Sequence, residues 1–318
     1  CSSDLIGLLQ AFGILVFPKI TLVLVFLVMA VVLVVRPWGL LGKPEPVTSH
    51  SFGRERPLRL GSKKHQWAWT ALVLGLIAVP AFADEYTLRL LIEVLIFALF
   101  ALSLNFIMGS GGMVSFGHAA YFGLGAYGAA LAVQHLGAPM EPALLLAPLA
   151  AGMGAFIFGW FIVRLSGVYL AMLTLAFAQI IWSIAFQWVE VTGGDNGMIG
   201  IWPAEWAKNP IAYYFLTLSV CSVGIWFLRR ALYAPFGYTL RAGRDSPLRA
   251  DAIGIDLRRH QWFAFALAGA SAGLGGGLFV FSKGNLDPGV LAIPTSVDSL
   301  VMVLIGGIQT ITGPLVGG

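Results

Sequence analysis

The sequence predicts an all-α protein, a polytopic bundle of transmembrane helices, and three observations support this. Of the 318 residues, 58% are hydrophobic and only 11% are charged, against about 25% charged residues in soluble domains. The mean hydropathy is +0.85, so lipid rather than water must cover much of the surface. The 39 glycines suit membrane helices, where glycine lets backbones approach closely.

Length and apolarity predict the individual spans, because a helix needs about 20 mostly apolar residues to cross a bilayer. We expect one N-terminal span and about eight more within residues 67–318. The predicted spans are 20–35, 67–83, 88–108, 115–135, 142–163, 168–188, 212–228, 260–282 and 297–311. The last is short and the chain does not begin with Met, so we expect a piece of a longer protein, cut at both ends.

Positive charge predicts the orientation of the spans. The segments 36–66 and 229–259 are both rich in Lys and Arg, which places both in the cytoplasm. Six predicted spans separate them, an even number, so the span count agrees with the charges. The loop from Val189 to Pro210 then lies outside. Residues 46–66 are polar, basic and rich in Pro, Gly and Ser, which is typical of a cytoplasmic linker.

A Gly-rich stretch between residues 105 and 128 predicts a broken helix within or near the membrane. Gly109, Gly111 and Gly112 interrupt the apolar pattern there. Irregular backbone at that depth is tolerated only inside protein or beside a water-filled cavity, and transporters place their pathways in such segments. A tight turn between two ordinary spans, with Gly123 and Gly125 packing against a neighbouring helix, is the structural alternative.

Two ionisable residues fall inside predicted spans. His118 follows Gly117 closely and is a candidate functional group; the interpretation we favour is an imidazole hydrogen-bonded to a backbone carbonyl that the helix break frees. Glu93 stands one turn after Arg89. It is either a proton-coupling carboxylate or, as we favour, half of an i, i+4 ion pair with Arg89 near the headgroups.

Several chemistries find no support in the sequence. Residues Gly123–Gly128 match G-x-G-x-x-G, but no strand precedes them and they lie in a predicted span, so we reject a dinucleotide site. No phosphate-binding loop of the G-x-x-x-x-G-K-[ST] type occurs, so any ATP drive must come from a partner. The two cysteines form no disulfide or zinc pattern. We therefore expect no catalytic residues, cofactor, metal or nucleic-acid partner.

The segment between the spans 212–228 and 260–282 predicts a basic amphipathic helix. Leu248, Ala252 and Ile255 recur on one helical face. Asp245 or Ser246 suits the N-cap, Pro247 the first turn, and Gly254 the end. Such a helix could dock into a cytoplasmic partner or rest on anionic lipid. In the outer loop, Thr192–Gly197 followed by Trp202 and Trp206 indicates turns and an interfacial belt, with a docking role as the alternative.

Five motifs in sequence order make residues 88–318 resemble the permease subunits of branched-chain amino-acid ABC importers, a family that includes urea and short-chain amide importers. The motifs are GMVSFGHAAYFGLGAY (112–127), RLSGVYLAMLTLAFAQ (164–179), TGGDNG (192–197), PFGYTLRAGRDS (235–246) and IGGIQTITGP (305–314). Residues 1–45, including RPWGLLG (36–42), instead resemble the C-terminal end of the companion permease. The resemblance thus predicts a fused pair: 1–45 from one permease, 46–66 a linker, and 67–318 a second, truncated permease.

The resemblance implies a multi-pass protein of the bacterial inner membrane that imports its solute by alternating access. The implied partners are the companion permease, two cytoplasmic ATPases that hydrolyse the ATP, a periplasmic solute-binding protein and membrane lipid. The predicted functional residues form three groups: for the translocation pathway Asn105, Gly112, Ser115, Gly117, His118 and Tyr121; for ATPase coupling Arg241, Arg244, Asp245 and Gly254; and for the periplasmic loop Gly193, Gly194, Asp195 and Gly197.

Three other functions stay open from the sequence. An importer for urea or short-chain amides would share the same permease architecture. A passive channel for a small solute would need no ATPase, and the basic segment 237–255 argues against it. An ion-coupled transporter would need an essential carboxylate, for which Glu93 is the candidate.

Overall fold

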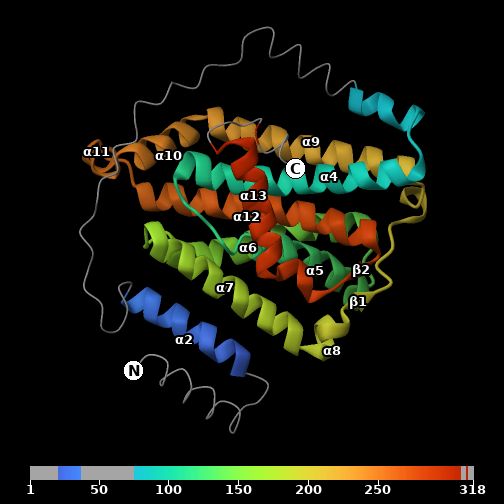
Figure 1. Ribbon diagram of the computed structural model, residues 1–318, viewed down its shortest axis with the longest axis horizontal. Helices are drawn as coiled ribbons and strands as arrows, with labels where there is room; N and C mark the ends of the chain where they lie inside the picture. Colours follow the sequence, from blue (N-terminus) through green and yellow to red (C-terminus); the bar gives the residue numbers. More distant parts are fainter. Residues whose placement is uncertain (1–20, 37–74, 309–312, 314–318) are drawn as a thin grey trace.

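The computed structural model describes residues 21–36, 75–308 and 313, and these form a helical bundle (Figure 1). The α-helices are α2 (Thr21–Val35), α4 (Glu85–Asn105), α5 (Ala119–Leu136), α6 (Met140–Ile162), α7 (Gly167–Gln187), α8 (Val189–Thr192), α9 (Pro210–Tyr233), α10 (Pro235–Asp245), α11 (Pro247–Ala252), α12 (Leu257–Lys283) and α13 (Ile293–Gly306). The short elements are η1 (Val79–Ala81), the π-helical η2 (Phe106–Ser110), η3 (Gly194–Asn196), β1 (Met198–Ile199), η4 (Glu205–Ala207), β2 (Asn285–Leu286) and η5 (Pro288–Leu291).

Five helices of the described chain are long and apolar enough to cross a membrane, which confirms the prediction of an all-α polytopic bundle. They are α4 continued through η2, α6, α7, α9 and α12. α2 and α13 are shorter apolar helices. Residues 67–74 of the predicted span 67–83 lie outside the described residues; the described part is a helical turn followed by η1.

Several predicted span boundaries were wrong by three to five residues, and the starts of α5 and α13 are two of them. The span predicted at 115–135 begins four residues later, at Ala119, because residues 113–118 are not helical. At 18 residues, α5 is roughly 27 Å long, just short of a bilayer's apolar core. The span predicted at 297–311 begins earlier, at Ile293. The broken helix therefore shortens α5 and leaves its N-terminus inside the bundle.

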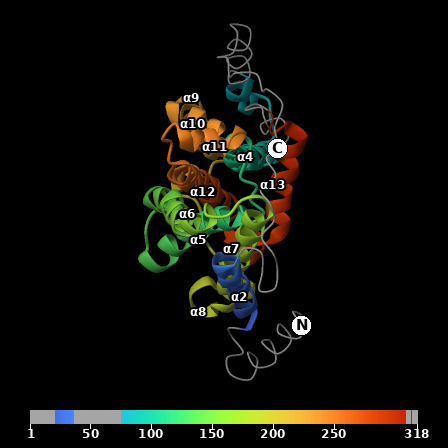
Figure 2. The same ribbon diagram turned by 90° about the vertical axis from the view of Figure 1, so that its left-hand side faces the viewer.

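Small residues let α12 pack at the centre of the bundle, between α4, α5 and α6 (Figure 2). A Cβ on Gly273 would collide with Ala151 of α6, and one on Gly276 with the Phe122 carbonyl of α5. Gly125 of α5 faces Gly273 directly. Close approach of this kind is how membrane helices gain van der Waals contact where lipid supplies no hydrophobic drive.

The outer face of α6 shows where lipid replaces protein. Leu145, Leu149, Met153 and Ile157 recur every four residues and are all exposed, which makes an apolar stripe along one side of the helix. Water would penalise such a stripe, whereas acyl chains solvate it. On the opposite edge of the bundle, α13 packs across α4, and α2 packs on α7 (Figures 1 and 2).

The two ends of the bundle differ in character. α10 and α11 lie at one end, and β1, β2 and α8 lie at the other (Figure 1). The first end carries the arginines of segment 229–259, and the second carries the loop between α7 and α9. The basic cluster and that loop therefore lie on opposite sides, as the charge pattern predicts for the described residues.

Candidate functional site

The end of α4 is the most irregular backbone in the bundle. The helix widens into the π-turn η2, where the N–H of Gly111 donates to both Ile107 and Met108. Gly112 then takes a left-handed conformation with φ +67°, which only glycine adopts without strain. π-turns inside helices are frequent at functional sites. The sequence prediction of a break around these glycines is confirmed.

After the break, residues 113–118 run as non-helical chain that is mostly buried, with Phe116 exposed. The N–H of Phe116 donates to Thr174 Oγ1 of α7 at 3.1 Å, and the N–H of Ala119 donates to Ser296 Oγ of α13 at 3.0 Å. A Cβ on Gly117 would collide with the Thr174 carbonyl. Side chains of two other helices thus replace the missing helical hydrogen bonds, which is what irregular backbone requires at membrane depth.

His118 is fully buried beside this segment. Its Nε2 lies 2.8 Å from Ser103 Oγ, and that hydroxyl donates to the Phe100 carbonyl at 2.7 Å. The ring stacks on Phe100 and meets Tyr121 edge to face, with centroids 5.5 and 5.9 Å apart. The expected bond to a freed backbone carbonyl is therefore wrong in its partner: the imidazole bonds a hydroxyl of α4. It holds the start of α5 against α4.

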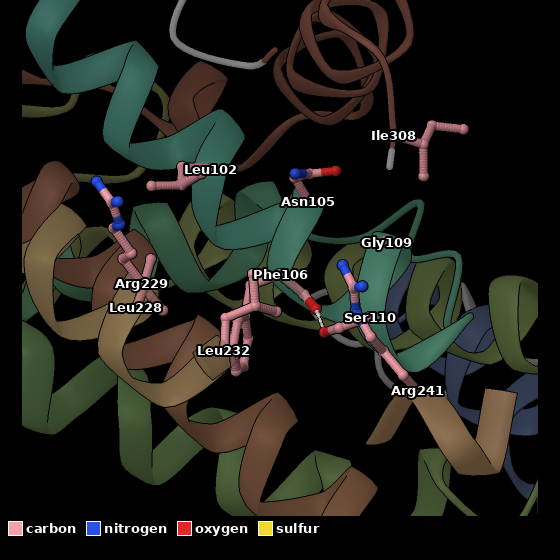
Figure 3. A pocket seen from close by; sticks show the side chains of 10 residues that line it. All are labelled: Leu102, Asn105, Phe106, Gly109, Ser110, Leu228, Arg229, Leu232, Arg241 and Ile308. Carbon is pink, nitrogen blue, oxygen red and sulfur yellow. Dashed lines mark hydrogen bonds between the residues drawn. The ribbon is translucent and has the colours of Figure 1, made fainter. Parts of the chain in front are cut away.

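A pocket with an empty volume of about 350 Å³ opens where η2, the end of α9 and α10 meet (Figure 3). Its polar lining comes from Asn105, Ser110, Arg229 and Arg241, and apolar side chains form the rest. The Ser110 hydroxyl donates its hydrogen bond to the Phe106 carbonyl and not into the pocket (Figure 3). The pocket therefore combines two cationic side chains with a mainly apolar wall.

The residues expected along the pathway do not lie together in the structure. Asn105 lines the pocket, whereas Ser115, Gly117, His118 and Tyr121 lie in the packed core. Gly112 lies against Arg244 of α10. Ser110 and Arg229 line the pocket but were not among the sequence candidates. Arg229 belongs to the basic cluster that predicted orientation, and that signal did not distinguish it from its neighbours.

The segment expected to couple to an ATPase forms two helices rather than one. Arg241, Arg244 and Asp245 lie on α10, and α11 begins after Ser246 with Pro247 at its first position. Ser246 occupies the N-cap without a side-chain hydrogen bond. Gly254, at φ +83°, follows the end of α11.

Two large apolar side chains in and just after this second helix are exposed, whereas its Ala250 is buried. Leu248 on α11 is 84% exposed, and Ile253 just after it is 74% exposed. The segment therefore offers uncovered apolar groups beside arginines at the basic end of the bundle.

The loop at the other end is a folded structure whose glycines are required by geometry. Gly193, Gly194 and Gly197 all have positive φ, and a Cβ on Gly193 would collide with the Gly197 carbonyl. Asp195 lies in η3 between them. β1 pairs antiparallel with β2, and Trp206 Nε1 donates to Glu141 of α6 at 2.8 Å. These contacts account for the turn residues of the motif.

The ion pair predicted between Arg89 and Glu93 was wrong. Arg89 instead pairs with Glu85 at 2.6 Å, and Glu93 pairs with Lys283 at the end of α12. Lys283 also lies 5.7 Å from the centre of the Phe279 ring. The side chain of Glu93 is 37% exposed, so this carboxylate joins two helices near the outer end and is not a midplane group. Among the described residues, no group of three or more His, Cys, Asp or Glu could hold a metal ion.

Comparison with known proteins agrees with this architecture. The family described as branched-chain amino acid transport system, permease component, matches residues 86–318. Two similar proteins are high-affinity branched-chain amino acid transport system permease proteins LivM, from Escherichia coli K12 (26% identical) and Salmonella typhimurium LT2 (25% identical). Each alignment covers 264 residues, 74% of this chain and 62% of the relative. The chain therefore spans less than two thirds of the length of these relatives.

A third similarity covers a shorter stretch of the chain. A probable branched-chain amino acid transport permease protein LivH from Methanocaldococcus jannaschii is 33% identical over 88 residues, which is 26% of each chain. No solved structure matches the chain. Because the family pattern extends over most of the sequence, from α4 to the final residue, the chain belongs to the permease component family of branched-chain amino acid transport systems.

Proposed function

We propose that this chain is the permease unit of an ATP-driven importer that carries branched-chain amino acids across the bacterial inner membrane. The observation that supports this most is the family match over residues 86–318. The chain is a transport subunit rather than an enzyme, and its long apolar helices make it a multi-pass membrane protein. Hydrolysis of ATP is assigned in this proposal to two cytoplasmic partner ATPases.

The arrangement of the two ends supports the proposed partners. α10 and α11 present exposed apolar groups and arginines at the basic end, a surface suited to a cytoplasmic ATPase. The folded loop from 188 to 209 at the opposite end is suited to a periplasmic solute-binding protein. A companion permease completes the membrane part, and the N-terminal segment 1–45 is the proposed remnant of that companion in a fused pair.

The proposed mechanism is alternating access. Movement of α10 and α11 on the ATPases would shift the broken segment 105–118 and so change which end of the permease is open. Each state must be favoured by contacts that the other lacks. Three polar groups of the pocket lie beside the break: Asn105 of α4, Arg229 of α9 and Arg241 of α10. They line the proposed route near the cytoplasmic end.

Uptake of labelled leucine tests the proposal most directly. The full-length parent protein would be reconstituted with its ATPases and binding protein, with excess unlabelled urea as competitor. We expect ATP-dependent leucine uptake that urea does not reduce. ATP-dependent urea uptake without leucine uptake would keep the importer and change the substrate. Flux that persists without the ATPases would refute the importer and favour a passive channel.

A further inference from the structure

The broken end of α4 is capped by a side chain from another helix. The last carbonyls of a helix lack partners within the helix and carry the negative end of its dipole. One of them, the Gly109 carbonyl, accepts a hydrogen bond from Arg244 Nη1 of α10. A guanidinium at a helix C-terminus is favoured both as a donor and as a positive charge. The cap therefore joins α10 to the break across 135 residues of sequence.

Arg244 is held in one arrangement rather than being mobile. Its Nε and Nη2 lie 3.1 and 2.9 Å from Asp245 Oδ1, and its side chain is only 10% exposed. Its aliphatic stem lies on Gly112, where a Cβ would come within 2.7 Å of the Arg244 Cγ. The guanidinium thus contacts Gly109, within the π-turn, and the stem contacts Gly112, just after it.

The two contact points are the start of the chain that leads into the core. Gly112 is followed by the non-helical segment 113–118, in which the Phe116 N–H donates to Thr174, and then by α5, whose first residue Ala119 donates its N–H to Ser296. Arg241, one turn earlier on α10, lies in the neighbouring pocket. Arg244 of α10 contacts both Gly109 and Gly112, so it connects this helix directly to the break.

We propose that Arg244 is the positioning residue that makes α10 and the broken segment 109–118 move together. The connection of α10 to the broken segment through Arg244, called the tie below, is a property of this chain. Its role in transport rests on the proposed function: movement imposed on α10 by an ATPase reaches the start of α5 through Arg244.

The first test measures the tie without transport. In the full-length protein, a nitroxide on Phe116→Cys, a position that is 40% exposed, reports the mobility of the segment. We expect an immobile label in the otherwise unchanged protein and a more mobile one in Arg244→Gln, with Arg244→Lys between them. Gly112→Ala should also loosen the label, because its Cβ displaces the stem and a residue with a Cβ is strained in this left-handed conformation. Arg164→Gln removes an exposed arginine that stacks on Trp160 and is the matched control.

The second test measures coupling in the reconstituted importer, as solute taken up per ATP hydrolysed. We expect Arg244→Gln to lower this ratio about tenfold or more, the scale of a lost hydrogen bond to a charged group, while Arg164→Gln leaves it unchanged. If the label is mobile in Arg244→Gln but the unmodified protein shows no ATP-dependent uptake, the proposed function is refuted and the tie is kept. An unchanged label in Arg244→Gln overturns the tie, and an unchanged ratio with a mobile label overturns its role in coupling.

Discussion

Exchange of one methyl group between α6 and α12 tests the close packing at the centre of the bundle. A Cβ on Gly277 would lie 2.6 Å from the Ala147 Cβ, whereas unstrained carbons stay about 3.5–4.0 Å apart. Gly277→Ala therefore requires a shift of about 1 Å between two packed helices. Overpacking of this kind costs about 1–3 kcal/mol, and the gain in helix propensity offsets up to about 1 kcal/mol. We expect a net loss of about 1–2 kcal/mol.

Thermal unfolding of the purified protein in detergent measures this loss. The double variant Gly277→Ala with Ala147→Gly returns the methyl count and the summed propensity to their original values, so most of the stability should return. Gly75→Ala is the control, because a Cβ there meets nothing within 4 Å. A melting temperature for Gly277→Ala at or above that of the unmodified protein would refute the close approach of these helices, and additive effects in the double variant would place the strain elsewhere.

Three further changes test single contacts. Glu93→Gln should cost less than about 1 kcal/mol, because its pair with Lys283 is partly exposed, and uptake should persist; loss of uptake would revive an ion-coupled mechanism. Ser103→Ala should cost about 1–3 kcal/mol in thermal unfolding, since it removes the hydroxyl that bonds the buried His118 Nε2; an unchanged melting temperature would contradict this contact. Asn209→Ala should cost about 1 kcal/mol, because Asn209 caps α9 by accepting from the Ile211 N–H at 3.0 Å; Asn209→Asp, which keeps the acceptor, should retain most of the stability.

Most of the membrane helices could be predicted because lipid imposes a simple rule on sequence: a long apolar run with few charges. α4, α6, α7, α9 and α12 satisfy it without reference to any neighbour. The start of α5 does not follow this rule. Residues 115–118 are mostly apolar or small, and their non-helical path is supported by hydrogen bonds that the N–H groups of Phe116 and Ala119 donate to Thr174 and Ser296.

The site was predictable only where local geometry determines the residue. Gly112 was predicted as part of a helix break and Gly193 and Gly197 as turn residues, and all three have the positive φ that favours glycine. Partners distant in sequence were not predicted: Glu93 pairs with Lys283, and Arg89 pairs with Glu85. The i, i+4 rule offers Arg89 two equivalent partners, Glu85 and Glu93, and the tertiary fold decides between them. Ser110 and Arg229 were missed because a pocket between three elements leaves no pattern in any one of them.

The short ladder between β1 and β2 joins the outer loop to the end of α12, so a label on this loop should report the motion of that helix. Met198 pairs with Leu286 and Ile199 with Asn285, and the N–H groups of Gly200 and Ile201 both donate to the Gly284 carbonyl, 3.1 Å away. The loop is thus fastened to the end of α12 and should tilt with it as one body. A fluorophore at Ile199, which is 78% exposed, would then record the motion of the central helix from outside the membrane.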